Sequence, residues 1–283
     1  SYSGKIYRGK HLKTSEEVII KCCKKEREWI REVEALKSLN HPNIVKMIGN
    51  YDKNININYD NIGNVSIIGL EYASNGDLYR FLNKNKTISE DVTRTIVNQI
   101  VDGLIYAYSI NISHRDIKLE NIFITNSGSI VIGDWGLCAF QSKNRYSKSS
   151  CGTLGYMAPE ILCKLNYNPS KADVWSLGVL LFSLVSGVRP YTEPKSRRKD
   201  NFDNSWEGAW LESILMKNWK LFWKSHENHS NIDFSDELKD LIEKCLEPSF
   251  KKRISLIELK EHKWFEGTYV LNNNIIDLAN IDV

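Results

Sequence analysis

The sequence predicts an α+β fold in two lobes: a small lobe with an antiparallel sheet and one helix, and a larger, mainly helical lobe. Its 283 residues exceed a typical domain of roughly 100 to 200 residues, which leaves room for both lobes. Strand-like, β-branched segments dominate residues 1–72, whereas helical periodicity dominates residues 73–283. A turn at residues 74–76 follows this change. We therefore expect the lobes to meet near Ala73.

The small lobe is expected to open with a hairpin and a helix. Residues 6–23 are rich in β-branched side chains and are interrupted at Gly9 and Lys10, which indicates a hairpin. Residues 25–39 combine charged and apolar side chains at helical spacing. The apolar face of this helix comprises Ile30, Val33, Leu36 and Leu39. Pro42 sets its end, because the residue before a proline is biased away from helical backbone.

The remaining elements follow in order along the chain. Residues 50–64 are rich in asparagine without a clean period, and we interpret them as a loop inserted before a strand at residues 65–72. Apolar residues at four-residue spacing predict a long helix over residues 89–110, with Ser89 as its N-cap. Short strands are expected at residues 122–124 and 130–132. A polar loop and further helices complete the larger lobe.

Composition narrows the class of protein only slightly. The 38 basic and 35 acidic residues leave a net charge of +3, too small a field to favour nucleic acid or a membrane as a partner. The sequence contains no run of about 18 apolar residues and opens with no charged-then-apolar leader, so we expect an intracellular, cytoplasmic protein. Its six cysteines follow neither a metal-ligand spacing nor a dense disulfide framework, which indicates reduced thiols.

Two short motifs carry the chemistry, "HRDIKLEN" at residues 114–121 and "GDWG" at residues 133–136. Phosphoryl transfer from a nucleotide needs hard oxygen ligands for magnesium, a carboxylate to orient the acceptor hydroxyl, and cations against the phosphates. The motifs supply these groups. They resemble the catalytic loop and the metal-binding motif of eukaryotic protein kinases, and the resemblance covers essentially the whole chain.

This resemblance implies the two-lobed protein kinase fold, with ATP and Mg²⁺ as cofactors. Asp116 would accept the proton of the substrate hydroxyl, Asn121 would hold one magnesium ion, and Asp134 would bridge magnesium to the phosphates. Lys118, two residues after the catalytic aspartate, matches serine/threonine kinases.

The stretch "CGTLGYMAPE" resembles the end of the kinase activation segment, which would span residues 134–160. Thr153 within it would lie near the catalytic aspartate and lysine. By the same resemblance, Asp173 in "DVWSLGV" would hold the backbone of the catalytic loop. Arg253 would pair with Glu160, and both roles would serve the scaffold.

Lys21, in "EVIIKCC", is similar to the third-strand lysine of kinases, which contacts the α- and β-phosphates and pairs with a glutamate of the following helix. Counting back from the motif after that helix, the matching glutamate is Glu32. Glu28 and Glu34 remain alternatives, because helix positions inferred from sequence shift by about two residues.

The resemblance also implies a nucleotide site with departures from the family pattern. Gly4 would be the last glycine of the loop that covers the phosphates, so the first strand of the family would be missing. Ile19 replaces a small alanine beside adenine, where the casein kinase of the second type tolerates valine. The other residues around the nucleotide would be Ile6, Leu70, Glu71, Ala73, Asp77 and Phe123.

Trp135 replaces the phenylalanine that usually follows the metal-binding aspartate. A buried indole N–H needs an acceptor. Our hypothesis is that this hydrogen bond favours the inward, metal-competent placement of Asp134.

Arg115 precedes the catalytic aspartate, as in kinases whose activation loop is ordered by phosphate. A phosphate four residues before Thr153 would fall on Ser149 and place about two negative charges near this arginine. We therefore expect activation by an upstream kinase. Ser147 and Ser150 remain alternative sites.

Asp77 and Glu120 occupy positions that face ribose and basic substrate residues in basophilic kinases. They predict protein substrates with basic residues near the acceptor, although Asp77 alone is also typical of an ordinary turn. The aromatic-rich residues 193–234 either pack the helices of their own lobe or form a groove for a partner.

We interpret the chain as a serine/threonine protein kinase that transfers the γ-phosphate of ATP to protein hydroxyls. A pseudokinase scaffold is the alternative, motivated by Ser1 and Ile19 in place of the family's glycine and alanine. The full activation segment argues against a kinase of small molecules. "SSCGT" and "IKLEN" favour the calmodulin-dependent and AMP-activated group, while the asparagine-rich insert is similar to the initiation-factor-2 kinases.

Overall fold

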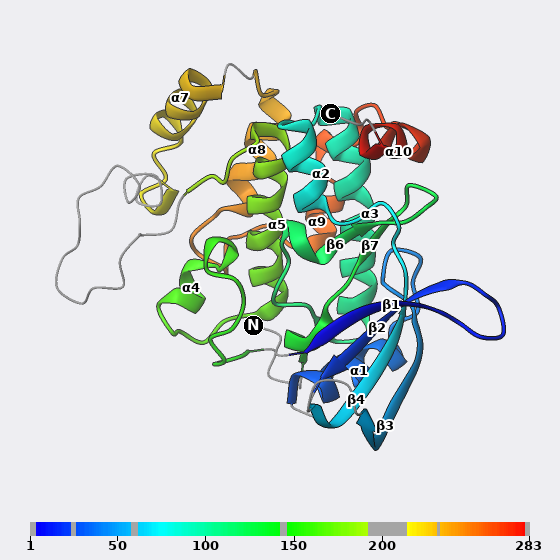
Figure 1. Ribbon diagram of the computed structural model, residues 1–283. Helices are drawn as coiled ribbons and strands as arrows, with labels where there is room; N and C mark the ends of the chain where they lie inside the picture. Colours follow the sequence, from blue (N-terminus) through cyan, green and yellow to red (C-terminus); the bar gives the residue numbers. More distant parts are fainter. Residues whose placement is uncertain are drawn as a thin grey trace.

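The computed structural model describes residues 4–23, 27–57, 62–141, 146–191, 214–230 and 233–280. Its small lobe is a four-stranded antiparallel sheet with one helix (Figure 1). In spatial order the strands are β1 (Lys5–Lys10), β2 (Glu17–Cys23), β4 (Ile62–Glu71) and β3 (Met47–Ile57). Helix α1 (Arg27–Ser38) packs against β3 and against the short helix η2 (Trp135–Leu137) of the larger lobe.

The register of the sheet gathers one group of side chains on one face. Ile6 lies opposite Lys21, and Leu70 lies opposite Ile19. Directly opposed residues project to the same side of an antiparallel sheet, and so do residues two apart on one strand. These four side chains therefore share a face.

The larger lobe is built around helix α5 (Pro169–Ser186), which is buried along nearly its whole length. Asn168 caps its first turn, Pro169 fits the first helical position, and Gly187 ends it in the left-handed conformation at φ 75°. The elements that precede it are α2 (Leu78–Asn85), α3 (Glu90–Ser109), β5 (Ile112–Ser113), η1 (Leu119–Asn121), β6 (Ile122–Ile124), β7 (Ile130–Ile132), β8 (Ala139–Phe140), η3 (Leu154–Tyr156) and α4 (Pro159–Leu162). Those that follow are α7 (Trp219–Ser230), α8 (Asp236–Cys245), α9 (Leu256–Lys260), η4 (Lys263–Glu266) and α10 (Asn272–Asn280).

The predicted long helix and the two predicted short strands are confirmed. Ser89 accepts a hydrogen bond from the N–H of Val92, as expected of the N-cap of α3.

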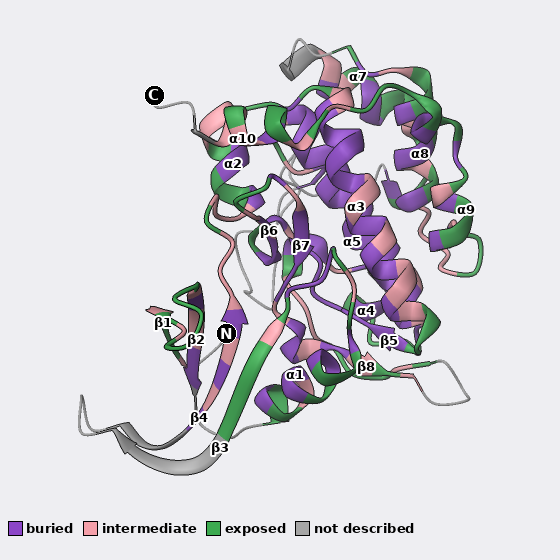
Figure 2. Ribbon diagram, turned by 90° about the vertical axis from the view of Figure 1, so that its right-hand side faces the viewer, coloured by how far each residue is buried: buried purple, intermediate pink, exposed green. Residues whose placement is uncertain are grey.

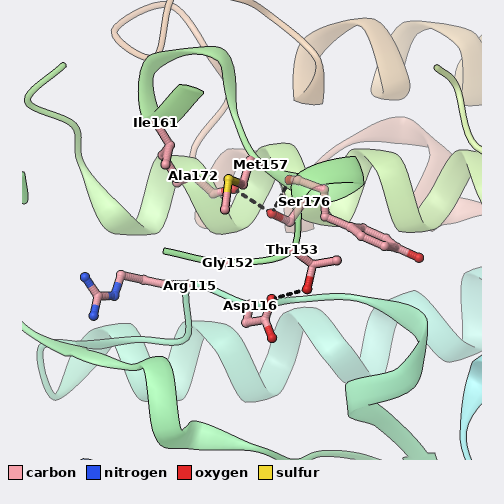
Figure 3. A pocket seen from close by; sticks show the side chains of 9 residues that line it. Arg115, Asp116, Gly152, Thr153, Met157, Ile161, Ala172 and Ser176 are labelled. Carbon is pink, nitrogen blue, oxygen red and sulfur yellow. Dashed lines mark hydrogen bonds between the residues drawn. The ribbon is translucent and has the colours of Figure 1, made fainter. Parts of the chain in front are cut away.

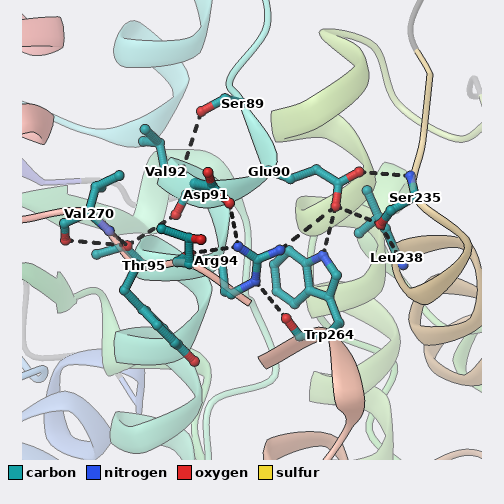
Figure 4. A network of polar contacts seen from close by, with 12 residues as sticks. Ser89, Glu90, Asp91, Val92, Arg94, Thr95, Ser235, Leu238, Trp264 and Val270 are labelled. Atoms are coloured by element: carbon teal, nitrogen blue, oxygen red, sulfur yellow. Dashed lines mark hydrogen bonds and ion pairs between the residues drawn. The ribbon is translucent and has the colours of Figure 1, made fainter. Parts of the chain in front are cut away.

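The start of α3 also forms hydrogen bonds with later parts of the lobe (Figure 4). Glu90 accepts hydrogen bonds from Ser235, before α8, and from the Trp264 indole of η4, at 2.7 and 3.1 Å. Arg94 donates to the Trp264 carbonyl at 2.6 Å.

The predicted turn of the first hairpin was placed wrongly. Gly9 lies inside β1 opposite Val18, and the turn occupies residues 11–16. A Cβ atom at Gly9 would lie 2.9 Å from Cδ1 of Ile20, so this glycine permits close packing within the sheet.

The prediction of a loop over residues 50–64 is wrong for most of that range. Residues 50–57 belong to β3 and residues 62–64 to β4, while residues 58–61 lie outside the described residues. The alternation Asn-Ile-Asn-Ile from residue 54 has the two-residue period of a strand, and the high asparagine content obscured it.

Two further expectations concern packing. The buried face of α1 is formed by Trp29, Val33 and Leu36, whereas the expected Ile30 is 38% exposed. Within the aromatic-rich segment, residues 192–213 lie outside the described part, but Phe222 is fully buried against Phe182 of α5. This contact supports packing within the lobe.

Strand β4 ends at Glu71 and α2 begins at Leu78, and the division of the chain at Ala73 stays a prediction. Within the described ranges, no helix combines the length and apolar character needed to cross a membrane.

Candidate active site

Lys21 contacts two carboxylates, one from each lobe. Its Nζ lies 2.6 Å from Oε1 of Glu32 and 3.1 Å from Oδ1 of Asp134. Burial disfavours the charged lysine, but the two carboxylates outweigh it and raise the pKa of Lys21. Burial likewise disfavours the charged form of Asp134, yet the attraction of Lys21 outweighs burial and lowers the pKa of the Asp134 carboxyl. Because strand β2 and helix α1 present these groups toward η2, the ion pairs join the lobes.

The structure selects among the three candidate glutamates of α1. Glu32 is buried beside Lys21, whereas Glu28 and Glu34 are exposed. The helix phase that buries Trp29 and Val33 also turns Glu32 toward the sheet.

A side chain of α5 fixes the backbone of the catalytic loop. Asp173 accepts the backbone N–H groups of His114 and Arg115 at 2.8 and 2.7 Å. Burial raises the pKa of Asp173 to about 7, against the effect of these two hydrogen bonds. Arg115 has φ 67°, a left-handed conformation that a non-glycine residue keeps only where its surroundings enforce it.

His114 links the catalytic loop to the metal-binding motif. Its fully buried ring bonds the Gly133 carbonyl through Nε2 at 2.8 Å, and Nδ1 accepts the N–H of Asp116 at 3.2 Å. Burial lowers the pKa of His114, in keeping with a neutral ring that donates at one nitrogen and accepts at the other.

Asp116 is fixed by three side chains (Figure 3 shows Thr153 beside it). The Thr153 hydroxyl donates to Oδ1 at 2.8 Å, and Nζ of Lys118 lies 2.9 Å from both Oδ2 and the Thr153 oxygen. Asn121 donates from Nδ2 to the Asp116 carbonyl and to Oδ2 at 2.8 and 3.2 Å. The cavity lined by Thr153 and Arg115 has about 10 Å³, room for roughly one water molecule.

The residues present fit a hard cation. Because the Asn121 amide nitrogen serves Asp116, the amide oxygen is the atom oriented for a metal. The Asp134 carboxylate is bound by Lys21 through Oδ1 and keeps 37% of its side chain exposed. An amide oxygen and a carboxylate are ligands that magnesium prefers.

The shared face of the sheet overlies this site, and Ile19 lies on it, partly buried beside Leu70. Ile6 is 59% exposed. On the opposite side, Phe123 leans over Gly133, where an added Cβ would approach the ring to 2.7 Å. Ser1, Tyr2 and Ser3 of the expected phosphate loop lie outside the described residues, and only Gly4 of that loop is described.

Trp135 is completely buried and meets the His114 ring edge-on at 4.6 Å between centroids. Its indole N–H donates to the Ile132 carbonyl at 3.2 Å. Asp134 points inward, to Lys21, with φ 57°. This is the geometry that the hypothesis on Trp135 requires, and the causal role of the indole bond stays a prediction.

Around the activation segment, the Arg115 guanidinium contacts Ser147, one of the alternative phosphorylation sites, and the phosphate on Ser149 stays a prediction. Nη1 of Arg115 lies 3.4 Å from the Ser147 hydroxyl, which also accepts the N–H of Ser149 at 3.2 Å. Ser147 pairs with Tyr167 through two backbone hydrogen bonds, and the Tyr167 hydroxyl donates to the Ser149 carbonyl at 2.9 Å. Ser149 and Ser150 are exposed.

The two acidic residues expected to bind substrate differ in their surroundings. Asp77 caps α2 by accepting the N–H of Arg80 at 2.9 Å, which agrees with the turn interpretation. Glu120 is exposed beside the catalytic loop.

Comparison with known proteins agrees with this geometry. Residues 2–265 match the protein kinase domain family. The chain belongs to the protein kinase family. It is 31% identical over 279 residues to "CBL-interacting protein kinase 26" of Oryza sativa subsp. japonica, which covers 95% of this chain and 50% of that protein.

Two other relatives are named as serine/threonine kinases. "Probable serine/threonine-protein kinase MARK-B" of Dictyostelium discoideum is 31% identical over 94% of this chain and 35% of its own length. "CBL-interacting serine/threonine-protein kinase 15" of Arabidopsis thaliana is 31% identical over 92% of this chain and 58% of its own length. These names confirm the predicted serine/threonine type. The chain spans about half the length of these relatives.

Sequence reasoning missed two residues of the kinase site. Tyr167 holds the activation segment, but a lone tyrosine between motifs carries no local signal. Gly133 leaves room for Phe123, and its place directly before Asp134 is the signal that could have found it.

Proposed function

We propose that this kinase domain transfers the γ-phosphate of ATP to serine and threonine hydroxyls of proteins, with Mg²⁺. The observation that carries the proposal is the arrangement of Asp116, Lys118 and Thr153 beside the Lys21–Glu32–Asp134 group.

Each group has a role that its geometry supports. Asp116 accepts the proton of the substrate hydroxyl, and Thr153 and Lys118 hold its carboxylate in position. Lys21 binds the nucleotide phosphates while Glu32 fixes its direction. Bound magnesium, held by Asn121 and Asp134, would neutralise phosphate charge.

Transfer of labelled γ-phosphate to peptides that carry serine, threonine or tyrosine tests the proposal. The parent chain should label serine and threonine peptides, whereas Lys21→Met and Asp134→Asn should not. Lys37→Met, at an exposed position of α1, is the matched control and should behave as the parent. Equal labelling by all four proteins would reject the proposal.

Phosphorylation of Ser149 by an upstream kinase is proposed as the activating event. A phosphate carries about two negative charges at neutral pH, and the Arg115 guanidinium contacts Ser147, two residues before Ser149. Mass mapping of active protein, with Ser149→Ala and Ser147→Ala compared, decides between these serines. Full activity with unmodified Ser149 would reject it.

A preference for basic residues near the acceptor is proposed through Glu120, which is exposed and free of the capping role that occupies Asp77. Peptide arrays should show a basic preference that Glu120→Gln weakens and Asp77→Asn affects less. A flat or acidic profile for the parent would refute it. The scaffold alternative rests, within the described residues, on Ile19, because Ser1 lies outside them.

A further inference from the structure

Helix α10 lies beyond residues 2–265, the part of the chain that matches the family. It packs against α2 (Figure 2), and Ile275 is fully buried. Its contacts therefore come from outside the part matched to the family, and they reach elements that border the nucleotide site.

The beginning of α10 contacts the turn between β6 and β7. Asn272 donates from Nδ2 to the Ser129 hydroxyl at 3.2 Å and accepts from Gln99 of α3 at 3.4 Å. The two backbones nearly touch, because a Cβ at Gly128 would lie 2.2 Å from the Asn272 carbonyl oxygen. Gly128 also has φ 75°, a conformation suited to glycine.

The end of α10 contacts the end of α2. Lys84 donates to the Ala279 carbonyl at 2.9 Å, and Asn85 donates to the Leu278 carbonyl at 3.3 Å. The last carbonyls of a helix lack partners within the helix and carry partial negative charge. A lysine ammonium can donate a hydrogen bond to such a carbonyl and also carries the opposite charge. The bonds from Lys84 and Asn85 therefore connect α2 to α10.

The segment that connects the lobes leads directly into α2 and is hydrogen-bonded to β6. The N–H of Asn75 donates to the Ile124 carbonyl at 3.1 Å, and the N–H of Ile124 donates to the Gly76 carbonyl at 2.8 Å. Asp77, the cap of α2, pairs with Phe123 of β6. Any movement of α2 away from β6 would therefore move residues expected to contact the nucleotide.

We propose that α10 is a positioning element for the nucleotide site. It holds α2 and the β6–β7 turn at a fixed separation, and so sets the distance between the connecting segment and Phe123. The proposal rests on the proposed function, since it assumes that ATP binds between these elements.

Direct titration with ATP and Mg²⁺ tests the proposal without relying on phosphate transfer. Lys84→Gln removes one tie, and Lys86→Gln, an exposed position of the same helix end, removes the same charge as a matched control. Lys84→Gln and a chain ending at Val270 should raise the Kd for ATP about 3- to 10-fold. The kcat and the KM for peptide should change less than about twofold, a split that general destabilisation would not produce.

Gly128→Ala completes a double-mutant cycle with the shortened chain. Alanine at φ 75° strains the β6–β7 turn in both chains, but only in the full chain does the added methyl group also displace α10, so Gly128→Ala should weaken ATP binding more in the full chain than in the chain ending at Val270. Unchanged Kd in Lys84→Gln and in the shortened chain, with the parent binding ATP, would overturn this inference alone. A parent chain that binds no ATP would overturn the proposed function as well.

Discussion

The ion pair between Glu160 and Arg253 allows a quantitative test of the scaffold. The Arg253 side chain is fully buried and Glu160 is 3% exposed, with two hydrogen bonds of 2.7 and 2.9 Å between them. Arg253 also donates to the carbonyls of Lys171 and Glu247. Glu160→Gln keeps the shape of the site but leaves the arginine charge uncompensated in the interior.

Removal of one partner of a buried ion pair costs about 3 to 5 kcal/mol. Set against a total of roughly 5 to 15 kcal/mol for a typical protein, this loss is large. At about 2 to 4 °C per kcal/mol for a chain of this size, the melting temperature should fall by about 6 to 20 °C. Equilibrium unfolding in urea and thermal unfolding measure the change.

Two comparisons control the experiment. Glu17→Gln breaks the exposed pair with Arg8 and should leave the unfolding midpoint nearly unchanged. Joint replacement of Glu160 and Arg253 by methionine removes both charges and should recover much of the lost stability. Glu160→Gln as stable as Glu17→Gln would refute the reasoning.

Three further predictions concern the site. Because burial lowers the pKa of His114 in the folded chain, the unfolded chain binds more protons below about pH 6.5. Stability should therefore fall as the pH is lowered through this range, by up to about 1.4 kcal/mol per pH unit, and His114→Tyr should lack this component in urea unfolding between pH 5 and 8. Thr153→Val removes the hydroxyl between the catalytic aspartate and lysine and should lower kcat about 10- to 100-fold in steady-state assays, whereas Thr153→Ser should keep most activity. Glu32→Gln should raise the KM for ATP, while Glu34→Gln, exposed on the same helix, should not; equal values would place the lysine partner elsewhere.

The catalytic loop could be predicted from sequence because its groups lie within a few residues of one another. Asp116, Lys118 and Asn121 share one loop, so their types and spacing already fix their neighbourhood. The sequence left three glutamates as partners of Lys21, and the burial of one face of α1 resolved the choice in favour of Glu32.

Other features depend on contacts between distant segments. Tyr167 and Ser147 meet through backbone hydrogen bonds that no local pattern encodes. The sequence around Gly9 predicts a turn, but in the structure the absence of a side chain at Gly9 leaves room for Ile20 on the neighbouring strand. The close packing at Gly128 likewise depends on α10, which follows more than a hundred residues later in the sequence.

Single-turnover phosphate transfer by Asp116→Asn, with the ATP Kd measured on the same protein, tests the central claim most directly. Asparagine keeps the shape of the side chain but cannot serve as the carboxylate base for the hydroxyl proton. The transfer rate should fall about 10²- to 10⁴-fold while the Kd stays within about twofold of the parent. A transfer rate equal to that of the parent would contradict the assignment of this site.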